Sequence, residues 1–279
     1  MTAGPARGEL LITPHRPAEE LFGLGPIEVS GDTARGSMTT VAWMTDAAGR
    51  PSAGMLGVLL DDVVGQATLT ARPEGCWPVT TELSIDVLGG LPADGTVLVA
   101  ESELLVGGER AGTARGEVRG PAGRLLAVAT VTTHYVPGIP AFADEPSPAP
   151  SAPPFARHLH EALCAVLEVR PGGGAVIELP PGPAVENAGG RGHGGVLAAV
   201  ADVVAAAAVD DEEAPLRTTG LRVAYLRPAV FDGPLVLTAS VVHRGRSTAL
   251  TRVDVLGGDG RVCAAASVTA GVDDDCPNP

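Results

Sequence analysis

Two long aliphatic segments dominate the hydrophobic pattern of this chain. Residues 55–71 and 195–209 are almost continuously apolar over several helical turns, which predicts two buried helices. Downstream of the second segment, apolar and polar residues alternate in Leu235–Val242 and Leu250–Val255. That alternation is typical of antiparallel strands with one face on a core.

The same pattern occurs twice along the chain. TTELSIDV (80–87) aligns with TTGLRVAY (218–225), and GMLGVLLDDVVGQAT (54–68) aligns with GGVLAAVADVVAAAA (194–208). Each copy, of roughly 110 residues, predicts opening strands, a helix and a β-rich remainder. One helix against an antiparallel sheet of about five strands is an α+β unit.

The opening strands are expected at Ala34–Met44 in the first copy and Ala175–Leu179 in the second. Between the copies, residues 136–154 hold seven prolines and read as an extended linker.

We therefore divide the chain into an N-terminal unit (1–136), a proline-rich linker (137–154) and a C-terminal unit with a short acidic tail (155–279). Each unit leaves a sheet edge and a face to cover, so we expect the two to pair within the chain.

Composition narrows the classes of partner. A net charge of −14 argues against nucleic acid and anionic membranes as main partners, because phosphate contacts need clustered Lys and Arg. The N-terminus lacks the apolar core of a signal peptide, and four scattered cysteines indicate thiols. We expect a cytoplasmic protein with no metal or other cofactor.

The densest candidate chemistry lies in ENAGGRGHGGVLAAVAD, residues 186–202. Asn187 and His193 sit in a glycine-rich turn, and Gly194-Gly195 begins the helix with unpaired amides that can hold an oxyanion. Asp202 lies two turns into the apolar helix, where a carboxylate needs a partner, a wet cleft or a raised pKa.

Plainer interpretations of this stretch stay open. The glycines can simply start a helix, Asn187 can cap the turn, and His193 can be structural. GRGHGG also fits the dinucleotide motif GxGxxG, but about ten loop residues separate it from the preceding strand and more strands follow, which disfavours that interpretation.

The first copy carries two neighbouring acids, Asp61 and Asp62, in its helix. Aligning DVV with DVV selects Asp62 as the counterpart of Asp202. Asp61 lies about 100° around the helix and is expected to face outward.

The order Asn-x5-His-Gly-Gly, a helical Asp, a Thr 16 residues later and Tyr-x-x-Pro resembles the PaaI-like acyl-CoA thioesterases of the hotdog fold. The matching residues are Asn187, His193, Gly194, Gly195, Asp202, Thr218, Tyr225 and Pro228. The resemblance covers both copies, most of residues 30–272. It implies a double hotdog with two antiparallel sheets, each wrapping a long central helix.

In the family resembled, one unit supplies Asn, His and a Gly amide to a site between units, and the other supplies the helical Asp and a Ser or Thr. One complete composite site follows, made of Asp62, Thr80, Asn187, His193 and Gly194. The second pairs Asp202 and Thr218 with a first-copy loop in which Ala47 and Ala53 replace Asn and His. We expect this second site to be weak or silent.

The resemblance implies hydrolysis of an acyl-CoA thioester. Asp62 would act as a general base on water or attack the carbonyl directly, and the sequence does not choose. The Gly194 N–H would stabilise the oxyanion, Asn187 and His193 would orient the carbonyl or the thiolate, and Thr80 would position the water.

Other residues are assigned to substrate binding. Gly195, Asp202 and Thr218 line the expected site, and Arg244 and Arg246 in HRGRS are candidates for the phosphates of coenzyme A. Arg191 and Arg227 are further candidates. For each arginine, a solvated turn is the competing interpretation.

The competing function is a non-catalytic acyl-CoA- or ligand-binding hotdog protein using the same cleft, with a hotdog hydratase ranked lower. The expected partner is a small acyl-CoA substrate, with further association into homo-oligomers left open. Few aromatic residues favour aliphatic over aryl acyl groups.

Overall fold

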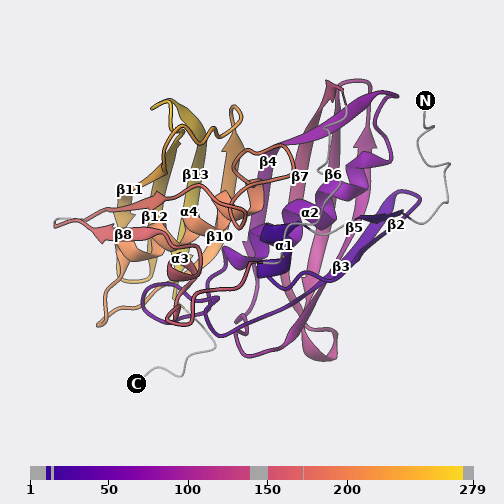
Figure 1. The fold of residues 1–279 in the computed structure, drawn as a ribbon. Coiled ribbons are helices and arrows are strands. Elements are labelled where there is room, and N and C mark those ends of the chain that lie inside the picture. Colours follow the sequence, from indigo (N-terminus) through magenta and orange to yellow (C-terminus); the bar gives the residue numbers. More distant parts are fainter. Residues whose placement is uncertain (1–10, 14–15, 139–149, 172, 273–279) are drawn as a thin grey trace.

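The computed structural model describes residues 11–13, 16–138, 150–171 and 173–272. A single antiparallel sheet forms one layer, and two long helices lie side by side against one of its faces (Figure 1). The elements of the N-terminal unit are β1 (Leu11–Thr13), α1 (Pro17–Leu21), β2 (Ile27–Ser30), β3 (Thr33–Thr39), α2 (Met55–Leu69), β4 (Cys76–Val87), β5 (Val97–Gly107), β6 (Ala111–Arg119), the 3₁₀ turn η1 (Pro121–Gly123) and β7 (Leu125–Pro137).

The C-terminal unit repeats this order without a counterpart of β1. Its elements are α3 (Leu159–Ala162), β8 (Val166–Val169), β9 (Ala175–Leu179), α4 (Gly194–Val209), β10 (Arg217–Tyr225), β11 (Leu235–Arg244), β12 (Thr248–Leu256) and β13 (Val262–Gly271).

The strand order is symmetric about the middle of the sheet. The thirteen strands run β1-β2-β3-β5-β6-β7-β4-β10-β13-β12-β11-β9-β8, so that after β1 each half mirrors the other about the β4–β10 junction. At this junction Leu221 pairs with Ile85 and Val223 pairs with Leu83. These pairs exchange under the alignment of TTELSIDV with TTGLRVAY, so the junction is locally two-fold symmetric.

This junction corrects one expectation. The two units do not keep separate sheets, because β4 and β10 hydrogen-bond edge to edge and join them into one. An exposed sheet edge carries unpaired N–H and C=O groups, and pairing the two edges satisfies them.

The predicted elements otherwise lie close to those observed. β9 spans the predicted Ala175–Leu179, and the helices begin at Met55 and Gly194. The expected strand 34–44 ends early, at Thr39. Beyond it the chain leaves the sheet and forms a loop that leads to Ser52 and the start of α2. β7 extends one residue into the predicted linker, and residues 139–149 of that linker lie outside the described residues.

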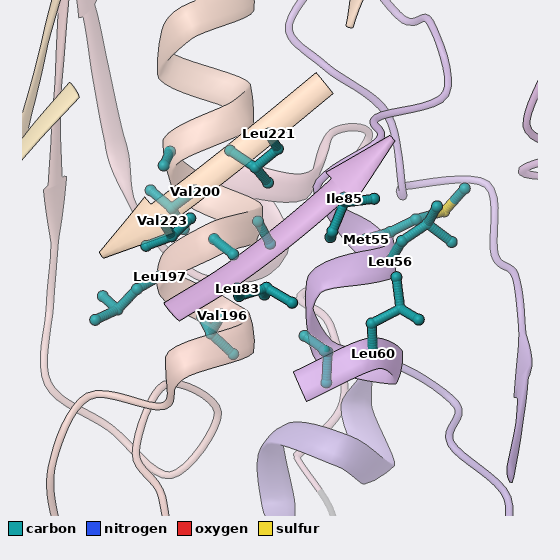
Figure 2. Close-up of a cluster of buried hydrophobic side chains, with 14 of the residues drawn as sticks. Met55, Leu56, Leu60, Leu83, Ile85, Val196, Leu197, Val200, Leu221 and Val223 are labelled. Atoms are coloured by element: carbon teal, nitrogen blue, oxygen red, sulfur yellow. The ribbon is translucent and has the colours of Figure 1, made fainter. Parts of the chain in front are cut away.

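Apolar side chains from both units meet beneath the junction. Figure 2 shows Leu83 and Ile85 of β4 and Leu221 and Val223 of β10 packed with side chains of α2 and α4, and all four are fully or almost fully buried. Fully burying an aliphatic side chain of this size contributes about 1.5–3 kcal/mol relative to leaving it exposed. The two units therefore share one hydrophobic core.

Glycines let the two helices approach closely at their N-terminal ends. A Cβ atom on Gly57 would lie 2.8 Å from the carbonyl oxygen of Gly195, and one on Gly195 would lie 2.5 Å from the Cα of Val58. On Gly54, a Cβ would lie 2.6 Å from the carbonyl oxygen of Ala199. Side-chain-free positions are therefore needed where α2 and α4 touch.

No helix among the described residues is both long and apolar enough to span a bilayer.

Gly57→Ala should destabilise the fold, by about 1–3 kcal/mol, because its methyl group would overpack the contact between the helices. The control is Gly65→Ala in the same helix, where an added Cβ meets nothing within 4 Å. Its better helix propensity should raise stability by up to about 1 kcal/mol. Urea unfolding of both variants measures the difference, and equal effects would contradict close helix packing at Gly57.

Candidate functional site

Asp61 of α2 binds groups from its own unit and from the other unit. Its Oδ1 accepts a hydrogen bond from the Thr80 hydroxyl at 2.8 Å, and its Oδ2 accepts one from the Gly195 N–H at 2.9 Å. The first donor lies on β4 and the second on the first turn of α4. The carboxylate is thus fixed between the units, with its side chain 13% exposed.

Asp202 of α4 is held in a similar way, by a threonine of its own unit and a helix-start N–H of the other unit. Its Oδ1 accepts from Thr218 at 2.6 Å, and its Oδ2 accepts from the Gly54 N–H at 2.8 Å. Ser52 adds a third donor to Oδ2 at 2.7 Å. Burial raises the pKa of Asp202, although these hydrogen bonds oppose the increase.

The matching hydrogen bonds correct the predicted register of the repeat. Asp61, not Asp62, is the counterpart of Asp202, and Gly54 corresponds to Gly195 rather than Gly194. The loops agree with this one-residue shift. Asp46 Oδ1 accepts from the N–H groups of residues 48 and 50, as Asn187 Oδ1 does from those of residues 189 and 191.

The first-copy loop therefore has polar residues at the two positions where alanines were expected. Asp46, not Ala47, stands at the Asn position, and Ser52, not Ala53, stands at the His position. The alignment on the two DVV tripeptides is wrong by one residue. The contact between the two helix starts sets the structural register, and the aliphatic residues inside the helices do not.

Asp62 faces a different environment from Asp61. Its Oδ2 lies 3.8 Å from Nε2 of His193 and is buried without a hydrogen bond. Burial and the nearby charges of Glu19 and Asp61 raise the pKa of Asp62 well above its usual range, against the opposing effect of His193. The structure brings Asp62 to the far side of the imidazole, away from the Thr80 hydroxyl.

His193 is the N-cap of α4 and is almost fully buried. Its Nδ1 lies 3.1 Å from the Gly195 nitrogen and 3.9 Å from Asp61 Oδ2. Its Nε2 lies 3.5 Å from Oε1 of Glu19, on α1. The ring is therefore surrounded by three carboxyl groups.

These carboxyl groups decide the charge of the imidazole. Burial alone lowers the pKa of His193, but the hydrogen bond to Glu19 and the charges of Asp62, Glu19 and Asp61 raise it to about 10. The ring is then a cation at neutral pH. Because a protonated Nδ1 cannot accept, the Gly195 N–H donates to Asp61 in that state.

Gly194 lies against the acid of the other unit. A Cβ there would lie 2.6 Å from Oδ2 of Asp61, so a larger residue would displace that carboxylate. Its carbonyl accepts from the Tyr225 hydroxyl at 2.7 Å. Burial, followed by the charge of Asp61, raises the pKa of Tyr225 well above its usual range, so the phenol stays a donor.

Asn187 lies in an exposed position, and its Oδ1 is occupied by loop N–H groups at 2.9 and 3.2 Å. The structure therefore shows it ordering the loop that delivers His193, and does not bring its side chain to Asp61.

The predicted phosphate ligands lie away from this site. Arg244 donates to the carbonyls of Val209 and Ala214 at the C-terminal end of α4, opposite His193. Arg246 is exposed in the adjacent hairpin turn. By contrast, Arg191 and Arg227 are exposed on two neighbouring loops joined by a 2.9 Å hydrogen bond from Gly192 N–H to Ala229 carbonyl.

A pocket of about 240 Å³ opens beside Asp202. Ser52, Thr218 and Arg50 line it together with aliphatic side chains such as Leu91 and Val209. Arg50 is held by Asp46 and Asp210, at 2.9 and 2.6 Å. The second site therefore has a pocket and a hydrogen-bonded acid, but carries a hydroxyl where the first has an imidazole.

Sequence reasoning missed two residues here. The one-residue error in the predicted register points to Asp62 in place of Asp61. Glu19 lies outside the recognised repeat, and no motif points to it; the two adjacent acids in the short helix PAEEL were the available signal.

The sequence matches the model of the thioesterase superfamily over residues 189–264. That segment runs from the loop before α4 into β13, and includes His193, Asp202 and Thr218. No curated protein matches the sequence.

Solved structures of thioesterases share the fold. The tesB protein of Mycobacterium avium subspecies paratuberculosis gives a TM-score of 0.61 at 16% identity, covering 88% of this chain and 94% of that one. The acyl-CoA thioesterase II TesB2 of Mycobacterium marinum gives 0.58 at 15% identity, covering 94% and 99%. An acyl-ACP thioesterase from Bacteroides thetaiotaomicron gives 0.55 at 14%, covering 86% and 98%. At these identities the likeness shows the fold.

Asp62→Asn should gain stability over the wild type as pH rises. The raised pKa means that folded Asp62 binds its proton more tightly than the unfolded chain does; the stability this proton confers is full below the unfolded pKa, near 3.9, and is lost as pH rises through the folded pKa. Asparagine has no proton to lose. Urea unfolding at pH 4 and pH 8 measures the effect, about 1.4 kcal/mol per unit of pKa shift.

The exposed Asp32→Asn is the control for replacing an aspartate at the surface. A difference for Asp62→Asn that stays constant from pH 4 to pH 8 would show that Asp62 does not titrate abnormally.

Proposed function

We propose that this chain hydrolyses acyl-CoA thioesters at a composite site between its two units. The observation that carries the proposal is the Asp61 carboxylate, held by Thr80 of its own unit and by the helix-start N–H of Gly195 from the other. The thioesterase match over residues 189–264 and the thioesterase fold support the reaction class.

The reaction adds water across the C–S bond and yields a carboxylic acid and a thiol. Asp61 takes the role first given to Asp62. Its carboxylate either removes a proton from the attacking water or itself attacks the thioester carbonyl, which forms an anhydride that water then opens. Thr80, fixed on Oδ1, orients the carboxylate and the water beside it.

Charge that develops on the thioester oxygen needs donors. Within the described residues no acceptor binds the Gly194 N–H, which lies at the positive end of α4. This amide and the cationic His193 form the proposed oxyanion site. Asn187 contributes by ordering the loop, and Tyr225 by holding the Gly194 carbonyl.

The architecture proposed is a double hotdog of the PaaI-like type, with units 1–136 and 155–279 joined by the proline-rich linker. The second site, at Asp202 and Thr218, keeps the acid and the helix-start amide but has Ser52 in place of His193. It has no imidazolium, and the Arg50 guanidinium that lines its pocket is paired with Asp46 and Asp210, so we assign it at most weak hydrolysis.

Arg191 and Arg227 replace Arg244 and Arg246 as the proposed ligands of the coenzyme A phosphates. Both are exposed on the joined loops that flank His193, whereas Arg244 is held by carbonyls at the far end of α4.

Asp61→Asn should lower thioester turnover by about 10²–10⁴-fold, because asparagine can neither accept the proton nor attack. Asp62→Asn and Asp202→Asn should cause smaller losses, since neither acid contacts both Thr80 and Gly195. Release of free thiol from a panel of acyl-CoA substrates measures turnover, and thermal unfolding checks that each variant folds.

Equal losses in Asp61→Asn and Asp202→Asn would refute a single composite site. Tight binding of acyl-CoA to the wild type without thiol release would favour the non-catalytic alternative. In a single turnover in ¹⁸O-water, ¹⁸O in the Asp61 carboxylate would show direct attack followed by water opening the anhydride at the Asp61 carbonyl carbon, because a general base does not exchange its oxygens.

Arg191→Ala combined with Arg227→Ala should raise KM for acyl-CoA by up to about fivefold per lost contact, as each exposed ion pair is worth about 0.2–1 kcal/mol. KM for an acyl-pantetheine, which lacks the phosphates, should not change. Arg246→Ala is the exposed control. An equal KM increase for both substrates would argue against phosphate binding by these arginines.

A further inference from the structure

A buried polar cluster lies behind His193, on the side away from Asp61. Glu19 Oε1 is 3.5 Å and Asp62 Oδ2 is 3.8 Å from Nε2 of the imidazole. The side chains of Glu19 and His193 are only 11% and 5% exposed. Burying ionisable groups costs free energy unless they are paired, so a cluster of this kind in an apolar core indicates a role that offsets the cost.

The cluster occurs at one of the two pseudo-equivalent places. α1 and α3 end in the same turn, with φ of 67° at Gly23 and 55° at Cys164. The hydrogen bond from Leu24 N–H to the Glu19 carbonyl is matched by that from Ala165 N–H to the His160 carbonyl.

His160 is thus the counterpart of Glu19. The same shift of 141 positions places Ser52 opposite His193 and Val203 opposite Asp62. Glutamate, histidine and aspartate at the first site therefore correspond to histidine, serine and valine at the second site. The two acids accompany the imidazole, which is the feature that separates the proposed catalytic site from its silent counterpart.

We propose that Glu19 is a positioning residue for thioester hydrolysis: it accepts the Nε2 proton of His193 and fixes the ring so that Nδ1 faces Asp61 and the start of α4. This inference rests on the proposed function. Glu19 comes from the N-terminal helix α1, whereas His193 belongs to the C-terminal unit, so the contact also ties the opening segment to the site.

A carboxylate that orients a catalytic imidazole is a common arrangement. Here the oriented ring is an imidazolium, which acts through its charge and does not act as a base. The titratable groups that face the ring are Glu19 from α1 and Asp61 and Asp62 from α2. Glu19 is the nearest carboxylate to Nε2, so its charge and position act most directly on the ring.

The test compares Glu19→Gln with the conservative Glu19→Asp and with Glu20→Gln, an exposed neighbour on the same helix. The His193 ring is followed by NMR across pH, with its signal assigned by its loss in His193→Gln. Glu19→Gln should lower the pKa of His193 and reduce kcat by about 10- to 100-fold, with a smaller change in KM. Glu19→Asp should recover part of both, and Glu20→Gln should change neither.

A double-mutant cycle separates positioning from a general loss of stability. In the His193→Gln background, Glu19→Gln should lower kcat little further, because its effect passes through the imidazole. Full additivity of the two substitutions would overturn the inference, as would an unchanged His193 titration in Glu19→Gln.

The two proposals fail separately. If the wild type releases no thiol from any acyl-CoA, the proposed function fails, and the His193 titration alone then decides whether Glu19 holds the ring. If the wild type hydrolyses thioesters and Glu19→Gln retains full kcat, the inference fails while the function stands.

Discussion

The close contact between the starts of α2 and α4 is the constraint on which the rest of the molecule depends. Gly54, Gly57 and Gly195 let the helices touch backbone to backbone. At that distance an N–H at the start of each helix reaches the carboxylate in the other helix, Gly195 to Asp61 and Gly54 to Asp202. A helix start has unpaired donors and a positive end, so it can compensate a buried acid.

This exchange makes the proposed site depend on both units. Neither unit by itself would hold its acid, because the second donor comes from its partner. The continuous sheet through β4 and β10 fixes the relative position of the two helices, and the shared core beneath it resists sliding. Once both units lie in one chain, their loops can diverge independently. One loop carries His193 and the other carries Ser52, so a symmetric scaffold presents two unlike sites.

The sequence predicted the helices and strands well, but it did not identify which acids contact the residues of the other unit. Periodicity located α2, α4 and β9 because local burial patterns persist over whole elements. Asp61 and Asp62 could not be separated in this way, since adjacent residues in an aliphatic helix share the same local pattern. Glu19 was missed for a related reason: it joins the site through a contact across 174 positions, between residues 19 and 193, which no local motif records.

The sequence by itself determined that two helix-and-sheet units repeat along this chain and that an Asn-His-Gly loop precedes only one helix. Those features follow from hydrophobic period and from residue type, which are local properties. Only the tertiary structure decided that the sheets merge, that Asp61 faces Gly195, and that Arg244 is held by carbonyls far from His193. These outcomes depend on which faces and edges come together, because a rotation of 100° about a helix axis changes the partner of a side chain without changing the pattern that forms the helix.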